Sequence, residues 1–313
     1  MRPRPGVTGD GAAPVRCAGP LSVASSNLGD MAQNARSTPG RKKPRAYDPV
    51  KIRAAVLAQF GLVREVVEGL SEEQLARPGG VGERSVRELA ARVPTALESA
   101  VRSLAEPARG AAEVGLLDWP FAMAKHGVRI SEDGAGSAQD AEGTAEDTAG
   151  IAADVPVAEL YARVAAAVAE ALPGADGDRV VPTRVGAMRF ADFLVTRTVE
   201  LVVHSDDLAR ATGVEIPFDR QALAACTRLL ADALAVKAPG ASTEVRIPPF
   251  AVVQCIEGPR HTRGTPPNVV ETDPLTWVRL ATGRAQWAAA VENAQVKASG
   301  ERADLMGVLP ILG

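Results

Sequence analysis

The chain has 313 residues, 46% of them hydrophobic, and carries 35 basic and 38 acidic side chains, which give a net charge of -3. This length suits two domains, each with its own core. The near-neutral balance excludes the broad positive surface that phosphate neutralisation requires, so nucleic acid is not an expected partner. No apolar run is long enough to span a bilayer, and the amino terminus lacks the apolar core of a signal peptide.

The cysteine content points to a reducing compartment. Cys17, Cys226 and Cys255 lie far apart and match no paired metal-ligand spacing. This arrangement indicates neither a disulfide framework nor a zinc knuckle. We therefore expect a soluble protein of the cytoplasm.

The amino-terminal residues show no apolar periodicity. Residues 1–46 are rich in Gly, Pro, Ala, Ser and Arg, and they can bury too little surface to offset the entropy of ordering. We predict a disordered tail there. Met31 lies inside this tail and is a second candidate translation start. The basic run Arg41 to Arg45 is either a patch for an anionic partner or a solvated segment.

Helical patterns follow from Asp48 onward. Asp48 is a suitable N-cap, and Pro49 suits the first turn of a helix. Ser85 and Glu88 have the spacing of a capping box at the start of a second helix, which we expect to be kinked near Pro94. Helices are predicted over residues 48–70, 85–104, 155–172, 189–213 and 218–236.

The connection between the second and third helices is long. Residues 115–130 are apolar but irregular, and residues 131–153 form an acidic, low-complexity loop. Four helices with one long connection predict an antiparallel bundle. We assign this bundle, with its acidic loop, to residues 47–240.

The remainder of the chain has a different pattern, which predicts a small α+β domain over residues 241–313. Short β-prone segments are separated by turn-rich loops and by two short helical segments. The expected strands are 243–247, 250–256, 269–272 and the start of 296–305, and the expected helices are 274–283 and 284–294.

Glu200 and His204 lie in an apolar run and are four residues apart, so they share one face of a helix. A buried carboxylate needs a partner, and Glu together with His can bind a divalent ion such as zinc. Alternatively, Glu200 pairs with an arginine, either Arg197 or one from a neighbouring helix, and His204 is a hydrogen-bonded core residue. The spacing alone leaves both interpretations open.

The segment TVELVVHSDDLARATG, together with a helix that begins Ser-Val-Arg-Glu-Leu, resembles the mycothiol-dependent maleylpyruvate isomerase family. The tail from VVETDPLTWVRLATG onward looks like the sterol-carrier-like domain of that family. The resemblance covers roughly residues 47–312 and implies a DinB-like four-helix bundle followed by a sterol-carrier-like α+β domain. It also implies a divalent metal, usually zinc, and the thiol cofactor mycothiol.

The resemblance places metal ligands on two helices of the bundle. Glu200 and His204 match two of the three ligands, and Arg92 stands where the family has a histidine. A guanidinium supplies no lone pair to a metal but pairs well with a carboxylate. We therefore expect an ion pair between Arg92 and Glu200 in place of the metal. His126 lies outside the helices, and we expect it at the surface.

The second domain offers a rival site. His261 and Arg263, with Arg260, lie among turn formers in GPRHTRGTPPN, where they either bind an anionic ligand or belong to a solvated loop. Trp277, Leu280 and Trp287 have near-helical spacing and either line an apolar groove or form core.

Two functions follow from these patterns. The first is a thiol-dependent isomerase or transferase that binds a divalent metal through Glu200 and His204. The second is a non-enzymatic, sterol-carrier-like protein without a metal, which binds an apolar or anionic small molecule. Arg92, His261 and Arg263 are the candidate ligand-binding residues.

Overall fold

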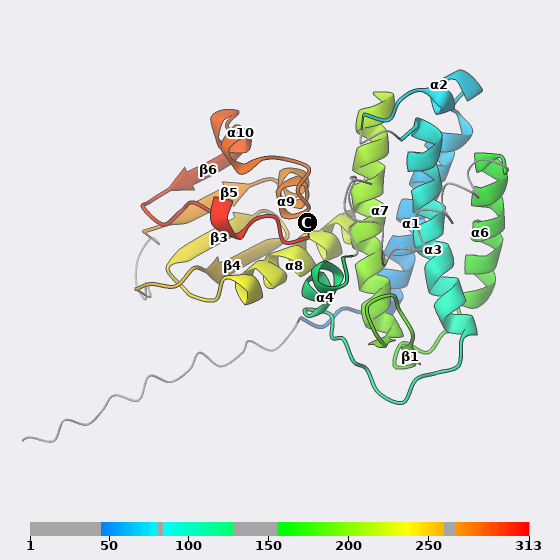
Figure 1. The fold of residues 1–313 in the computed structure, drawn as a ribbon, viewed down its shortest axis with the longest axis horizontal. Helices are drawn as coiled ribbons and strands as arrows, with labels where there is room; N and C mark the ends of the chain where they lie inside the picture. Colours follow the sequence, from blue (N-terminus) through cyan, green and yellow to red (C-terminus); the bar gives the residue numbers. More distant parts are fainter. Residues whose placement is uncertain (1–44, 81–83, 128–154, 260–266, 313) are drawn as a thin grey trace, which may run out of the picture. The chain divides into compact units, whose positions relative to one another are not determined.

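The computed structural model describes residues 45–80, 84–127, 155–259 and 267–312, all within one compact unit (Figure 1). Its first part is a bundle of four long helices that run side by side. These helices are α1 (Pro49–Glu68), α3 (Val86–Ala105), α6 (Val157–Ala171) and α7 (Phe190–Thr212). Shorter elements accompany the bundle: α2 (Glu72–Ala76), α4 (Trp119–Lys125), β1 (Val180–Val181) and β2 (Met188–Arg189).

The second part combines a four-stranded sheet with helices. The sheet has the order β4-β3-β5-β6, with β3 parallel to β5 and the other neighbours antiparallel. Its strands are β3 (Thr243–Ile247), β4 (Ala251–Cys255), β5 (Val269–Thr272) and β6 (Val296–Ser299). The helices are α8 (Arg220–Lys237), α9 (Pro274–Ala281), α10 (Trp287–Glu292) and the 3-10 turn η1 (Met306–Val308). The predicted α+β class, a four-helix bundle followed by a small α+β part, is confirmed.

The predicted helix starts rest on side-chain caps. Asp48 accepts hydrogen bonds from the backbone N–H groups of Val50 and Lys51. Ser85 and Glu88 form the expected capping box at the start of α3. Each cap satisfies backbone donors that a helix leaves unpaired at its first turn. The carboxyl end of α7 is also set by a local signal. The helix ends before Gly213, whose φ of 70° suits a residue without a Cβ.

Helix α7 is the centre of the molecule. It contacts α1 and α3 in the bundle and α8 beyond it. Nearly every side chain from Phe190 to Leu208 is therefore buried, including charged ones. A helix that is covered on all sides must pair its charges internally, and this requirement shapes the candidate site.

Pro94 lies inside α3, and the helix continues past this residue. A proline has no N–H, so the carbonyl of Ala90, four residues earlier, loses its usual helical partner. The hydroxyl of Tyr161 on α6 donates a hydrogen bond to this carbonyl at 2.9 Å. The Tyr161 ring also stacks on Phe60 of α1, with ring centroids 5.2 Å apart. One side chain thus compensates for the proline and joins three helices.

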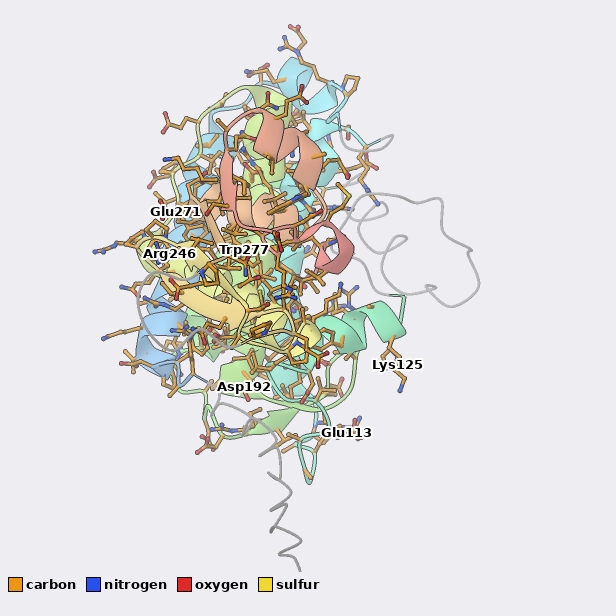
Figure 2. All side chains as sticks on the ribbon, turned by 90° about the vertical axis from the view of Figure 1, so that its left-hand side faces the viewer. Glu113, Lys125, Asp192, Arg246, Glu271 and Trp277 are labelled. Atoms are coloured by element: carbon orange, nitrogen blue, oxygen red, sulfur yellow. The ribbon has the colours of Figure 1, made fainter. Side chains whose placement is uncertain are left out.

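The sheet has one apolar and one polar face. Alternate residues such as Val245, Val253 and Val270 are buried, and α8 contacts β4. Arg246 of β3 and Glu271 of β5 are cross-strand neighbours that belong to the other face (Figure 2). Trp277, Leu280 and Trp287 are buried in the hydrophobic core, which agrees with the second of the two alternatives given for them, core and not groove.

Several expectations differ from the structure or fall outside it. The segment 115–130, expected to be irregular, contains α4, which begins after Asp118 with Pro120 in its first turn. Most of the predicted tail and the acidic loop 131–153 lie outside the described residues. The boundary expected between residues 240 and 241 stays a prediction, because α8 contacts α1 and α7 as well as β4 and α9. In the described ranges, no helix is both long and apolar enough to cross a membrane.

We predict that the Tyr161 hydroxyl matters for stability only because of Pro94. Tyr161→Phe should lower the free energy of unfolding by about 1–3 kcal/mol, the cost of leaving a buried carbonyl unpaired. In a Pro94→Ala background the new N–H can bond to the Ala90 carbonyl, so the same change should cost less than half as much. Urea unfolding of the four proteins measures both values. Equal costs in the two backgrounds would show that the hydroxyl does not replace the missing helical bond.

Candidate functional site: a buried polar cluster on helix α7

Glu200 and His204 lie one turn apart on α7, as the sequence predicts. Glu200 is only 6% exposed and His204 only 7%, because α7 is covered by neighbouring helices. Arg92 lies on α3, which packs directly against α7. We call Arg92, Arg197, Glu200 and His204 the polar cluster.

Glu200 pairs with Arg197, one turn earlier on the same helix. Arg197 Nη1 lies 2.8 Å from Glu200 Oε2, and both side chains are buried. This contact confirms Arg197 as a partner of Glu200, one of the two alternatives that the sequence leaves open, whereas the expected pair with Arg92 stays a prediction. The local arginine takes this role because a three-residue helical spacing brings the two side chains together without any tertiary contact.

Further contacts hold Arg197 in place. Its guanidinium donates to Thr196 Oγ1 and Ser99 Oγ, and it lies over the Phe193 ring at 4.3 Å from the ring centre. Burial lowers the pKa of Arg197, and the Glu200 carboxylate acts against this shift. Arg197 is therefore a fixed part of the cluster, while Glu200 Oε1 is buried and has no hydrogen-bond partner among the described residues.

His204 is held as a neutral imidazole. Burial lowers its pKa below the ordinary value, and the nearby charge of Arg92 lowers it further. The carboxylates of Asp207 and Glu200 act in the opposite direction without reversing the shift. A neutral imidazole offers one donor and one acceptor nitrogen. Arg92 thus belongs to the site through its charge on His204.

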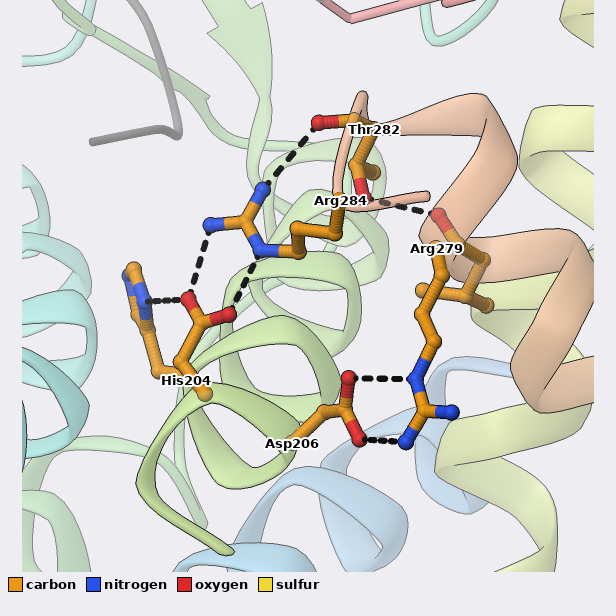
Figure 3. A network of polar contacts seen from close by, with 7 residues as sticks. His204, Asp206, Arg279, Thr282 and Arg284 are labelled. Carbon is orange, nitrogen blue, oxygen red and sulfur yellow. Dashed lines mark hydrogen bonds and ion pairs between the residues drawn. The ribbon is translucent and has the colours of Figure 1, made fainter. Parts of the chain in front are cut away.

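Two consecutive aspartates follow His204 and connect α7 to the carboxyl-terminal part of the chain (Figure 3). Asp206 binds Arg279 of α9 through two contacts, of 2.8 and 2.6 Å. Asp207 binds Arg284, just after α9, through two contacts of 2.8 Å. Bidentate pairs of this kind are among the strongest hydrogen-bonded contacts in proteins. Sequence reasoning missed them, and the only signal was the pair of aspartates in an otherwise buried helix.

Asp207 also faces His204. Its Oδ2 lies 3.9 Å from His204 Nδ1, which is longer than a hydrogen bond but close enough for the carboxylate charge to act on the imidazole ring. Burial alone would raise the pKa of Asp207, yet its contacts with His204 and Arg284 hold the pKa well below the usual range. The carboxylate therefore stays charged at neutral pH.

The residues of the polar cluster do not complete a metal site. A catalytic zinc normally has three protein ligands, whereas the cluster offers only Glu200 and His204 as donors. One oxygen of Glu200 already binds a guanidinium, and Arg92 adds a positive charge near His204. Within the described ranges, no group of three or more His, Cys, Asp and Glu side chains could hold a metal ion.

The remaining predicted site residues lie elsewhere. His126 ends α4 and is exposed, as expected. His261 and Arg263, with Arg260, fall outside the described residues, so their role as ligand-binding residues stays a prediction.

The carboxyl-terminal part of the chain matches a known protein family. Residues 219–311 match the family model of bacterial SCP orthologs. This SCP-matching segment begins at Asp219, the N-cap of α8, and it contains both Arg279 and Arg284. The two arginines that bind α7 therefore come from the SCP-matching segment. None of the curated proteins compared with the chain matches it.

Two solved structures are similar to the chain at low sequence identity. One is the crystal structure of the mycothiol-dependent maleylpyruvate isomerase, with 16% identity, a TM-score of 0.47, and coverage of 81% of this chain and 93% of that chain. The other is a histidine-to-alanine mutant of that enzyme, with 15% identity and the same TM-score and coverage. At this identity and TM-score, the likeness assigns no function to the chain.

We predict a loss of stability on mild acidification that depends on His204. Because the pKa of His204 is lowered in the folded protein, the unfolded chain takes up the proton first as the pH falls below about 6.5. The free energy of unfolding should then decrease by at most about 1.4 kcal/mol per pH unit from this residue. Asp207 adds nothing between pH 7.5 and 5.5, because the stability from its lowered pKa is lost only under stronger acid.

Urea unfolding at pH 7.5 and 5.5 tests this prediction. The difference between the two pH values should shrink in His204→Gln and stay at the wild-type value in His126→Gln, which changes an exposed histidine. An unchanged difference in His204→Gln would mean that this imidazole binds protons equally well in the folded and unfolded states.

Proposed function

We propose that this protein binds a small molecule directly at the polar cluster of α7, without a resident metal ion. The observation that carries the proposal is the 2.8 Å contact between Arg197 Nη1 and Glu200 Oε2. The carboxylate that a metal would require already has a cationic partner from its own helix. The protein is then a relative of the thiol-dependent isomerases in which direct hydrogen bonds replace metal coordination.

The chemistry of the cluster indicates the kind of molecule. Glu200 Oε1 is a buried acceptor, and leaving such an atom unpaired costs about 1–3 kcal/mol. A ligand N–H, O–H or S–H group would remove this cost, and the neutral His204 can exchange a further hydrogen bond. The helix around the cluster is apolar, with Val199, Val203 and Leu201 buried. A small molecule with a polar group on an apolar body fits these properties.

The SCP-matching segment supports the same proposal. Its relation to sterol-carrier-like proteins suggests an apolar or anionic small molecule as ligand, and its arginines reach the end of α7 that carries His204. Cys226 and Cys255 are free and buried, which suits a reducing compartment such as the cytoplasm.

A second candidate is a thiol-dependent isomerase or transferase that uses mycothiol and a divalent metal such as zinc. One observation favours it: Glu200 Oε1 and His204 Nδ1 are both buried without a hydrogen-bond partner in the described part of the chain. A metal ion would satisfy such atoms. It would need a third ligand, and Arg92 occupies the position that the resemblance gives to that ligand.

Zinc titration of chelator-treated protein, followed by calorimetry, separates the two candidates. We expect no stoichiometric zinc binding that depends on His204. Wild type, His204→Ala and the control His126→Ala should therefore give the same titration. One zinc per chain that is lost only in His204→Ala would contradict the proposal and establish the second candidate.

The ligand arm of the same experiment uses 1-decanol as the probe, because this alcohol carries one O–H donor on an apolar body. Chelator-treated wild type should bind it, and Glu200→Gln should weaken binding about tenfold, because a charged acceptor makes a hydrogen bond roughly twice as strong as a neutral one. Glu159→Gln, which changes an exposed glutamate of α6, is the matched control. Binding that requires added zinc would argue against direct recognition.

A further inference from the structure

Arg284 of the SCP-matching segment is linked to the polar cluster through Asp207, which lies between Arg284 and His204. Its Nε and Nη2 atoms each lie 2.8 Å from one oxygen of Asp207. Its Nη1 atom donates to the carbonyl oxygen of Thr282 at 3.2 Å, which anchors the guanidinium to its own loop. Both side chains are essentially fully buried, at 1% and 0% exposed. The Asp207 carboxylate is therefore fixed in one orientation.

This fixed carboxylate lies beside the imidazole of His204. Asp207 Oδ2 is 3.9 Å from His204 Nδ1 (Figure 3). The other charged groups that act on His204 are Glu200 on its own helix and Arg92 on α3. A carboxylate next to one ring nitrogen favours the tautomer that carries its proton on that nitrogen, and such a partner commonly orients a functional histidine.

We propose that Arg284 is a positioning residue for His204. By holding Asp207 in place, it keeps the proton of the neutral imidazole on Nδ1 and leaves Nε2 as the acceptor. The SCP-matching segment thereby determines which nitrogen of a bundle residue can accept a hydrogen bond from a ligand. The role in ligand binding rests on the proposed function, whereas the effect on the tautomer does not.

The neighbouring ion pair provides a matched control. Asp206 and Arg279 form the same bidentate contact, between the same helix and the same segment, one residue away. Arg279 binds Asp206, whereas the aspartate 3.9 Å from His204 is Asp207. Loss of Arg279 should thus weaken the attachment of the segment without altering the imidazole. Any effect seen only with Arg284 is specific to the Asp207–His204 contact.

Nitrogen-15 NMR of the histidine rings tests the proposal in the ligand-free, full-length protein. The chain contains three histidines, and His126→Gln and His261→Gln identify the signals of His204. At pH 8, wild type and Arg279→Met should show His204 protonated on Nδ1. Arg284→Met should shift the ring signals toward a mixture of the two tautomers, because Asp207 is then free to rotate.

A second variant keeps the test decisive if Arg284→Met does not fold. Arg284→Lys retains the charge but cannot hold both carboxylate oxygens, so it should shift the His204 signals in the same direction. Wild-type ring signals in a folded Arg284→Met or Arg284→Lys protein would overturn the proposal, as would an equal shift in Arg279→Met. The measurement involves neither zinc nor an added ligand, so its failure is distinct from a failure of the proposed function.

Discussion

Helix α7 is buried along most of its length, although its covered part carries four charged side chains. The rest of the structure depends on the pairing of these charges. Arg197 meets Glu200 within the helix, while Asp206 and Asp207 meet Arg279 and Arg284 from the SCP-matching segment. A buried charge without a partner costs several kcal/mol, so α7 can remain covered only if all of these pairs form together. The bundle and the carboxyl-terminal part therefore share one electrostatic network.

The same constraint supports the proposal that the candidate site works without a resident metal ion. Within the helix, Arg197 neutralises the Glu200 carboxylate, which lies one turn before His204. Contacts with Ser99, Thr196 and the Phe193 ring hold Arg197 in place. Arg92 adds a positive charge from α3, which opposes protonation of His204. The cluster is thus suited to hydrogen bonding with a polar group, and its histidine is held neutral by burial and by a neighbouring cation.

Local sequence signals predicted most of the fold, because they act over a few residues. The caps at Asp48 and Ser85, the β-prone segment 243–247 and the spacing of Glu200 and His204 are all of this kind. The partners of the buried charges were harder to predict. The sequence offers both Arg197 and Arg92 as partners of Glu200, and the local spacing that joins Arg197 to Glu200 does not show whether Arg92 also reaches the carboxylate. The contacts of Asp206 and Asp207 span more than seventy residues, a distance over which no periodicity or motif carries information. The Tyr161 bond to Ala90 is of the same type, since Pro94 signals a missing donor but not its replacement.

The Asp207–Arg284 pair forms part of the folded core of α7. A double-mutant cycle with Asp207→Asn, Arg284→Met and the combined variant, followed by urea unfolding at pH 7.5, measures the coupling free energy of this pair. Each single variant leaves a buried group without its partner, which should cost about 3–5 kcal/mol, and the combined variant should cost clearly less than the sum. We expect a coupling free energy of about 2 kcal/mol or more. A coupling within about 0.5 kcal/mol of zero, the range of independent sites, would contradict this expectation.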